Sequence, residues 1–228
     1  MLLDLVLGAQ VTLVEDRGTW EEHGEKVRQT AKDLEEAGRR VLVSRVGDES
    51  GLGLYSAAYV AAPLELIDQA DSHGMQIDQP WLCSPDTTQS GIAYALKYME
   101  SPIRLVGLPA LAEPVTSGWT FEECFSQTAN ACGQTLGLPA CVEPEDITSI
   151  TDYVAPGYSI LNDGAREAMQ LLGIQEGILL DTVYTSKAMA GLIDHIRKGK
   201  IPKEQKVVFL HTGGLPALFA YSDTLGLE

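Results

Sequence analysis

Three short polar segments carry the residue types that could do chemistry in this chain of 228 residues. The first, Ser84-Pro-Asp-Thr-Thr-Gln-Ser-Gly91, joins an expected strand to an expected helix. It offers hydroxyls and backbone N–H groups at a helix N-terminus, where free N–H groups and the helix dipole both favour phosphate. The alternative is an ordinary polar turn with a helix cap, because the carboxylate of Asp86 would repel an anion.

The other candidates lie nearer the C-terminus. In His211-Thr-Gly-Gly214 the paired glycines let the backbone approach a ligand closely, and the Thr212 hydroxyl can hydrogen bond a ring nitrogen. Tyr158 and Tyr184 carry phenols that can stack on a planar group and move protons. Lys187 has the amine that a Schiff base requires. The competing interpretations are a tight turn with a satisfied histidine, tyrosines that only pack, and a structural or surface lysine.

Strands that alternate with helices must position these segments. Short apolar or β-branched runs predict strands at 10–15, 41–46, 81–83, 103–108, 147–154, 177–181 and 206–211. Caps, glycines and helical patterning predict helices at 19–37, 55–71 with a break at Pro63, 92–100, from Thr120 with Glu123 as a capping box, 162–172 and 186–198. The alternation indicates an α/β fold with a mostly parallel sheet, in which ligands bind at the carboxyl ends of strands.

Composition excludes several classes of partner. A formal net charge of −16 argues against nucleic acid. No apolar run approaches the roughly 18–20 residues that span a bilayer, and the opening residues include Asp4 and have no basic lead-in, so we expect no membrane contact and a cytoplasmic protein. The four cysteines form no CxxC pair, so neither a disulfide scaffold nor a metal site is expected.

Three C-terminal stretches together resemble one enzyme family. They are Gly157-Tyr-Ser-Ile-Leu-Asn-Asp-Gly-Ala-Arg-Glu-Ala168, Glu176-Gly-Ile-Leu-Leu-Asp-Thr-Val-Tyr-Thr-Ser-Lys-Ala-Met189 and His211-Thr-Gly-Gly-Leu-Pro-Ala217, in the family's order and at its separations. The family comprises the pyridoxal-phosphate enzymes D-cysteine desulfhydrase and 1-aminocyclopropane-1-carboxylate deaminase, which have the tryptophan-synthase-β-like fold. Weaker similarity extends back through 83–91 to 2–9, so the resemblance covers nearly the whole chain.

The resemblance implies a three-layer αβα fold and a lyase or deaminase that acts on a small amino acid. It implies that the cofactor is bound by Ser84, Thr87, Thr88, Gln89, Thr185, Thr212 and Gly213, with the phosphate in the first four and the pyridine nitrogen facing Thr212. Tyr158 and Tyr184 would flank the substrate as catalytic residues. Thr185 and Thr212 favour the desulfhydrase branch, whereas Cys83-Ser84 favours the deaminase branch.

The sequence also departs from the family pattern. Family members begin upstream of this Met1, and that upstream segment carries the cofactor lysine and a Ser-Asn-His stretch. We therefore expect an N-terminally truncated enzyme, with residues 1–46 as a remnant of the smaller domain and 47–228 as the larger α/β domain. Pro85, Asp86 and Thr87 stand where the family's phosphate loop has glycines, and Gly47-Asp-Glu-Ser50 replaces a Gly-Gly-Ser-Asn loop.

These departures leave three functions open. The first is a pyridoxal-phosphate lyase whose missing part is supplied by another polypeptide. The second is a descendant that does cofactor-independent chemistry on a small molecule with Tyr158, Tyr184, Thr212 or His211. The third is a non-catalytic binding protein. Because a truncated sheet would expose an apolar edge, we expect a homodimer or a partner chain to cover it.

Overall fold

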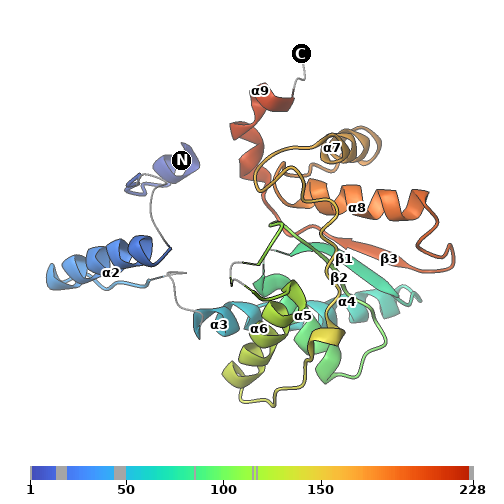
Figure 1. Cartoon of the computed structure of the whole chain (residues 1–228), viewed down its shortest axis with the longest axis horizontal. Helices are drawn as coiled ribbons and strands as arrows, with labels where there is room; N and C mark the ends of the chain where they lie inside the picture. Colours follow the sequence, from blue (N-terminus) through green and yellow to red (C-terminus); the bar gives the residue numbers. More distant parts are fainter. Residues whose placement is uncertain are drawn as a thin grey trace. The chain divides into compact units, whose positions relative to one another are not determined.

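The computed structural model describes residues 2–13, 20–43, 50–84, 86–114, 116 and 118–225. These residues form two compact units, Met1–Leu52 and Gly53–Glu228. Helix α3 (Ser50–Ala57) begins in the first unit and ends in the second. Figure 1 shows the order of the elements along the chain. None of the helices within the described ranges is long and apolar enough to cross a membrane.

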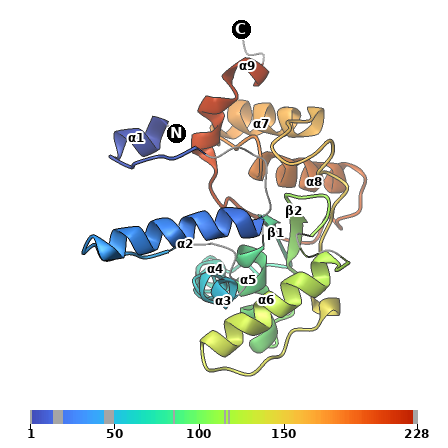
Figure 2. The same cartoon turned by 60° about the vertical axis from the view of Figure 1, so that its left-hand side comes forward.

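The first unit contains α1 (Leu2–Val6) and α2 (Trp20–Glu36), and α2 is its long helix in Figure 2. The chain leaves α2 through Gly38, whose φ of +78° suits glycine. This agrees with the predicted helix, although its expected first residue, Thr19, lies outside the described residues. The described parts of the two predicted strands, 10–13 and 41–43, form no strand, and the remaining residues of both strands lie outside the described ranges.

A parallel sheet forms the centre of the second unit. It contains β1 (Gln79–Ser84), β2 (Val106–Pro109) and β3 (Val207–Leu210) in the order β2-β1-β3. Every residue of the central strand β1 is buried. The register places Trp81 of β1 beside Val106 of β2 on one side and Phe209 of β3 on the other.

Helices cover both faces of this sheet. On one face lie α4 (Ala61–Ser72), α5 (Thr87–Tyr98) and α6 (Phe121–Thr135), and on the other lie α7 (Asp163–Glu176) and α8 (Thr185–Arg197), as Figure 1 shows. Leu82 belongs to the apolar core of the first face, whereas its neighbours Trp81 and Cys83 belong to the core of the second. This alternation is what a strand requires, and it confirms the predicted three-layer αβα fold.

Local capping signals determine several helix boundaries. The Thr120 and Glu123 capping box is confirmed: the Glu123 amide donates to Thr120 Oγ1 at 3.2 Å, and the Thr120 amide donates to Glu123 Oε2 at 2.7 Å. Asn162 caps α7 in the same way, accepting the Ala165 amide at 2.8 Å. Helix α7 runs four residues beyond the predicted end and finishes at Gly177, which takes the left-handed conformation.

Other boundaries differ from the prediction. Helix α5 begins at Thr87 rather than at residue 92, because the Asp86 side chain caps it. Pro63 lies in the first turn of α4, where its missing N–H costs nothing, and the break falls at 58–60. The chain closes with short helices, η2 (Leu215–Ala220) and α9 (Ser222–Leu225), and a further turn, η1 (Pro144–Asp146), precedes the second-face helices.

Two predicted strands are wrong. The segment 147–154 forms a single bridge, between Ser149 and Gly107. The segment 177–181 forms no strand, and the Ile178 amide instead donates to Leu172 O at the end of α7. Of its apolar side chains only that of Leu180 is buried. In both segments an apolar run was not enough, because a strand also needs a neighbour whose backbone is free to pair.

Candidate functional site

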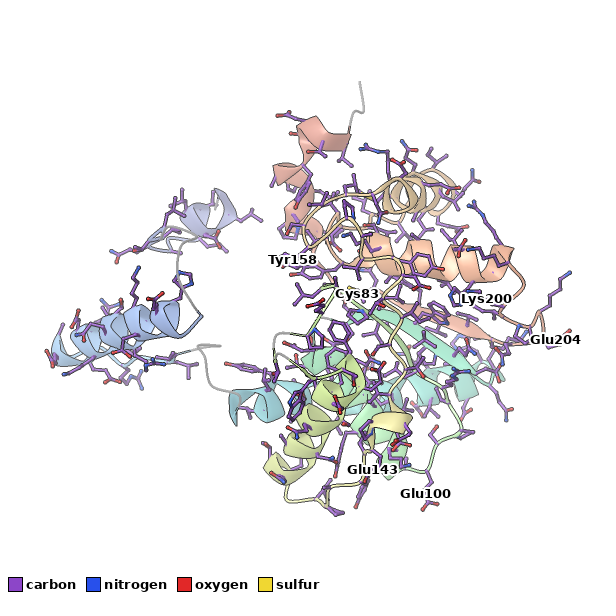
Figure 3. The ribbon with its side chains drawn as sticks, viewed as in Figure 1. Cys83, Glu100, Glu143, Tyr158, Lys200 and Glu204 are labelled. Atoms are coloured by element: carbon purple, nitrogen blue, oxygen red, sulfur yellow. The ribbon has the colours of Figure 1, made fainter. Side chains whose placement is uncertain are left out.

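The candidate site lies at the carboxyl end of β1, where α5 and α8 begin. In Figure 3, Cys83 and Tyr158 lie in the same central part of the second unit, whereas Glu100, Glu143 and Lys200 lie at its periphery. Cys83 also lies close to Tyr184, the hydrogen-bond partner of Tyr158, since it contributes to the raised pKa of the Tyr184 phenol. This is the position at which parallel α/β sheets bind ligands.

A buried carboxylate organises the start of α8. Asp181 accepts hydrogen bonds from the amides of Val183 (2.7 Å), Tyr184 (2.8 Å) and Thr185 (2.7 Å) and from the Thr185 hydroxyl (2.6 Å). The Asp181 amide donates back to Thr185 Oγ1 at 2.9 Å. Asp181 thus satisfies donors that the helix itself leaves free, and it fixes the backbone of both Tyr184 and Thr185.

Asp181 also contacts the loop that contains Gly213 and Gly214. A Cβ atom on Gly214 would lie 2.5 Å from Asp181 Cγ, so only glycine allows this contact. Asp181 was not among the site residues predicted from the sequence. An Asp followed by a Thr four residues later, ahead of a helix, is a local signal that could have found it.

The two predicted catalytic phenols meet. The hydroxyls of Tyr158 and Tyr184 are hydrogen bonded, and the ring centroids lie 6.0 Å apart at 64°. Burial raises the pKa of Tyr184, and its hydrogen bond with Tyr158 raises it further. Tyr184 therefore keeps its proton at neutral pH, whereas Tyr158 is 48% exposed and accessible from solvent. Their catalytic roles stay a prediction.

The predicted ring-binding residues differ in their surroundings. Thr185 is fully buried, and its hydroxyl is engaged by Asp181. Thr212 is exposed. Gly213 has a φ of +110° and donates its amide to His211 Nδ1 at 3.3 Å, while His211 Nε2 lies 2.7 Å from Leu179 O. In this arrangement Nδ1 accepts the Gly213 amide and Nε2 faces the Leu179 carbonyl.

The predicted phosphate residues lie at the end of β1 and in the first turn of α5. Ser84 is buried, and its hydroxyl has no hydrogen-bond partner among the described residues. Thr87 and Thr88 are buried as well. The carboxylate of Asp86 accepts the Thr87 amide, and Ser90 Oγ donates to the Asp86 carbonyl at 2.9 Å.

Gln89 points into the protein, where it has a structural contact. Its Nε2 donates to Thr148 O at 2.9 Å. The side chain lies over β2, since a Cβ atom on Gly107 would stand 1.9 Å from Gln89 Oε1. The contact joins α5 to the isolated bridge beside β2, and the predicted cofactor contact of Gln89 stays untested.

A lysine and a cysteine are buried next to the phenols. Lys187 is 3% exposed, and burial lowers the pKa of its amine. Burial and the charge of Asp181 raise the pKa of the Cys83 thiol, against an opposing effect of Lys187. Cys83 is therefore protonated and unreactive at neutral pH.

The donor set fits a phosphate group at the start of α5. Ser84, with its orphaned hydroxyl, precedes this helix end, and Thr87 and Thr88 are buried in its first turn, whose amides have no helical partner. One feature opposes it: a phosphate would have to displace the Asp86 carboxylate from the Thr87 amide. The carboxyl end of the sheet thus carries a helix end whose donors suit a phosphate, two hydrogen-bonded phenols and the imidazole of His211.

Comparison with known proteins gives this arrangement a family. Residues 2–213 match the family described as pyridoxal-phosphate dependent enzyme. The D-cysteine desulfhydrase of Salmonella typhi is 36% identical over 191 residues, and that of Salmonella schwarzengrund (strain CVM19633) is 35% identical over 194 residues. Each match covers 84% of this chain and 56% of the relative, so the chain spans just over half the length of these curated relatives.

Solved structures agree. A structure described as an ACC deaminase homologue superposes with a TM-score of 0.80 at 26% identity, covering 98% of this chain and 64% of the other. An O-ureido-L-serine synthase, at 15% identity and a TM-score of 0.56, supports the fold alone. The tryptophan-synthase-β-like fold is thus confirmed, and the chain belongs to the family of pyridoxal-phosphate-dependent enzymes.

Proposed function

We propose that this chain acts as a pyridoxal-phosphate-dependent lyase or deaminase on a small amino acid, of the D-cysteine desulfhydrase or 1-aminocyclopropane-1-carboxylate deaminase type. The observation that carries the proposal is the pair of hydrogen-bonded phenols, Tyr158 and Tyr184, at the carboxyl end of the parallel sheet. The family match and the relatives' names support it.

Each site residue receives a role in this proposal. Ser84, Thr87 and Thr88 hold the cofactor phosphate, together with the first-turn amides of α5. The other proposed cofactor-binding residues are Gln89, Thr185, Thr212 and Gly213. When bound, pyridoxal phosphate supplies an electron sink for the breaking of bonds at the substrate's carbon atoms.

The phenols handle the proton. Tyr184 carries its proton at neutral pH, as a phenol with an ordinary or raised pKa does, so its hydroxyl can donate to a leaving atom. Tyr158, half-exposed and hydrogen bonded to Tyr184, can return a proton from solvent to that hydroxyl. As to substrate, Thr185 and Thr212 favour D-cysteine, and Cys83-Ser84 favours 1-aminocyclopropane-1-carboxylate.

We also propose that 1–46 belongs to the smaller domain and 47–228 to the larger one, and that a second copy or a partner chain covers an edge of the sheet. Strand β3 is an edge strand whose residues are only half-buried. Leu179, whose carbonyl lies 2.7 Å from the ring of His211 just after β3, has an apolar side chain that is 58% exposed. Such an edge favours pairing with another chain.

A second candidate function is favoured by the contacts of two charged groups. The Asp86 carboxylate occupies an amide that a phosphate would use. The amine of Lys187, the one buried lysine among the described residues, is engaged by backbone carbonyls, and the other described lysines are exposed. These contacts suit a descendant that does cofactor-independent chemistry on a small molecule or that binds one without catalysis.

Activity measurements on the full chain separate the two functions. After incubation with pyridoxal phosphate, the first function predicts sulfide from D-cysteine or ammonia from 1-aminocyclopropane-1-carboxylate. Tyr184→Phe should lower kcat/KM about a hundredfold or more, because it removes a proton donor. Thr30→Ala, at an exposed position on α2, is the control and should leave it unchanged.

Borohydride treatment supplies the second readout. Under the first function it fixes the cofactor to a lysine of this chain or of a co-purified partner, which peptide mass mapping identifies. No cofactor absorbance and no turnover, together with binding of another small molecule, would reject the first function and support the second.

A further inference from the structure

Lys187 connects the two segments that carry the phenols. It lies on α8, three residues after Tyr184. Its Nζ donates to Val154 O at 2.8 Å and to Gly157 O at 2.6 Å. Gly157 immediately precedes Tyr158 in the sequence. One ammonium group therefore bridges the helix that presents one phenol and the loop that presents the other.

The loop has further anchors, and one of them also leads to α8: Tyr153 OH donates to Asp194 Oδ2 at 2.6 Å. Asn162 Nδ2 donates to the carbonyls of Tyr153 (3.1 Å) and Ala155 (2.7 Å), and Asn162 is the cap of α7. Tyr221 OH donates to Ser159 O at 2.6 Å from the C-terminal segment. The contacts of Asn162 and Tyr221 hold the loop to α7 and to the chain end. Tyr153 ties the start of the loop to the far end of α8, whereas Lys187 ties the residues next to Tyr158 to the start of α8.

Burying the Lys187 ammonium costs desolvation free energy, which indicates that its hydrogen bonds contribute to the structure of this site. Burial lowers the pKa of Lys187, and no ion pair among the described residues includes it. Two charge-assisted hydrogen bonds to carbonyls offset the desolvation. An apolar side chain of the same length would fill the space and leave both carbonyls without this donor.

We propose that Lys187 is a positioning residue that sets the distance between the Tyr158 and Tyr184 hydroxyls. The inference rests on the proposed function, in which this pair moves the proton. Without the ammonium, the segment from Val154 to Tyr158 is released from α8, the phenols separate and water reaches Tyr184. The pKa of Tyr184 then falls towards that of an ordinary tyrosine, because its burial and its hydrogen bond with Tyr158, which raise the pKa, both weaken.

Alkaline titration of the cofactor-free chain tests this directly. Tyrosinate absorbance in the native chain should include a late-titrating phenol that Tyr184→Phe removes. Lys187→Met should move that phenol to lower pH by about one unit or more. Lys200→Met, an exposed lysine that Figure 3 shows at the periphery, should leave it in place. A folded Lys187→Met chain with an unmoved late phenol would overturn the proposal.

A second measurement needs no variant, so it applies even if Lys187→Met does not fold. Reductive methylation of the native chain should modify Lys187 at least about tenfold more slowly than Lys200, because its amine is buried and held by two acceptors. Equal rates would show that the bridge is not formed and would overturn the proposal.

A third readout separates this inference from the proposed function. If the function holds, Lys187→Met lowers kcat on D-cysteine and leaves the affinity for pyridoxal phosphate unchanged. If the native chain has no activity, the titration and the methylation still decide the role of Lys187. Loss of turnover with an unmoved Tyr184 titration would assign the effect to another cause.

Discussion

Single side chains set the geometry of this site, and Asp181 sets most of it. Its carboxylate accepts three amides and one hydroxyl, and its side chain rests against Gly214. Asp181 is buried and both of its carboxylate oxygens accept hydrogen bonds, so it joins the start of α8 to the loop that contains Thr212 and Gly214. The positions of Tyr184 and Thr185 depend on this one residue.

Asp181→Asn should destabilise the fold markedly. The amide has nearly the same shape, but it loses the charge and turns one acceptor into a donor that faces backbone N–H groups. The free energy of unfolding should fall by about 3 kcal/mol, measured by urea denaturation. Asp163→Asn, an exposed first-turn residue of α7, should cost about 1 kcal/mol or less. Equal costs for the two variants would contradict the role of Asp181.

The Tyr184 phenol predicts how stability depends on alkaline pH. Its pKa is raised in the folded chain, mainly by burial, so the unfolded chain loses this proton first. Above the ordinary phenol pKa of about 10, the folded state binds more protons and the free energy of unfolding falls as pH rises. Tyr184→Phe should flatten this decline in pH-dependent denaturation. An unchanged slope would show that Tyr184 titrates normally.

At the residue scale, the sequence predicted which side chains could do chemistry, but it did not predict the contacts that hold them. The phenol pair was expected from a resemblance, and the structure brings the two hydroxyls together. Asp181 and the burial of Lys187 were missed. The carbonyls that hold Lys187 lie 30 and 33 residues away in sequence, so no local pattern reports them.

Among the elements, α5 decides whether a phosphate can bind. Asp86 caps its first amide, as a phosphate would. Asp86→Ala should lower the free energy of unfolding by about 1 kcal/mol because the cap is lost. The same change should raise the affinity for inorganic phosphate in equilibrium dialysis, because a negative charge leaves the helix end.

A matched cap variant provides the control for this prediction. Thr120→Ala removes the cap of α6 and should cost about the same stability without changing phosphate affinity. If both variants, or neither, change phosphate binding, the start of α5 is not the anion site.

Helices were more predictable than strands because their signals are local. The Thr120 capping box and the Asn162 cap each lie within four residues of the groups they satisfy. Strand pairing depends on distant partners, so the apolar runs at 147–154 and 177–181 could not show whether a strand ladder would form. The exposed side chains of Ile178 and Leu179 belong to such an unpaired segment.

For the whole molecule, the sheet edge predicts association. The chain spans just over half the length of its curated relatives, and β3 presents an unpaired edge among the described residues. Light scattering after size exclusion should therefore give a mass of at least twice 24.6 kDa, or a complex with a co-expressed partner. Replacing Val207 of β3 by proline should reduce that mass, because the register turns the Val207 N–H away from β1 and proline removes this edge donor. A monomer at all concentrations would contradict the expected cover.

Cofactor binding tests the central claim most directly. Pyridoxal phosphate is titrated into the full chain, and its absorbance is followed for the native protein, Thr88→Ala and Thr30→Ala. A phosphate site at the start of α5 predicts saturable binding, weakened about tenfold in Thr88→Ala and unchanged in Thr30→Ala. Absent binding, or equal affinity in all three proteins, would mean that this end of the sheet does not hold the cofactor.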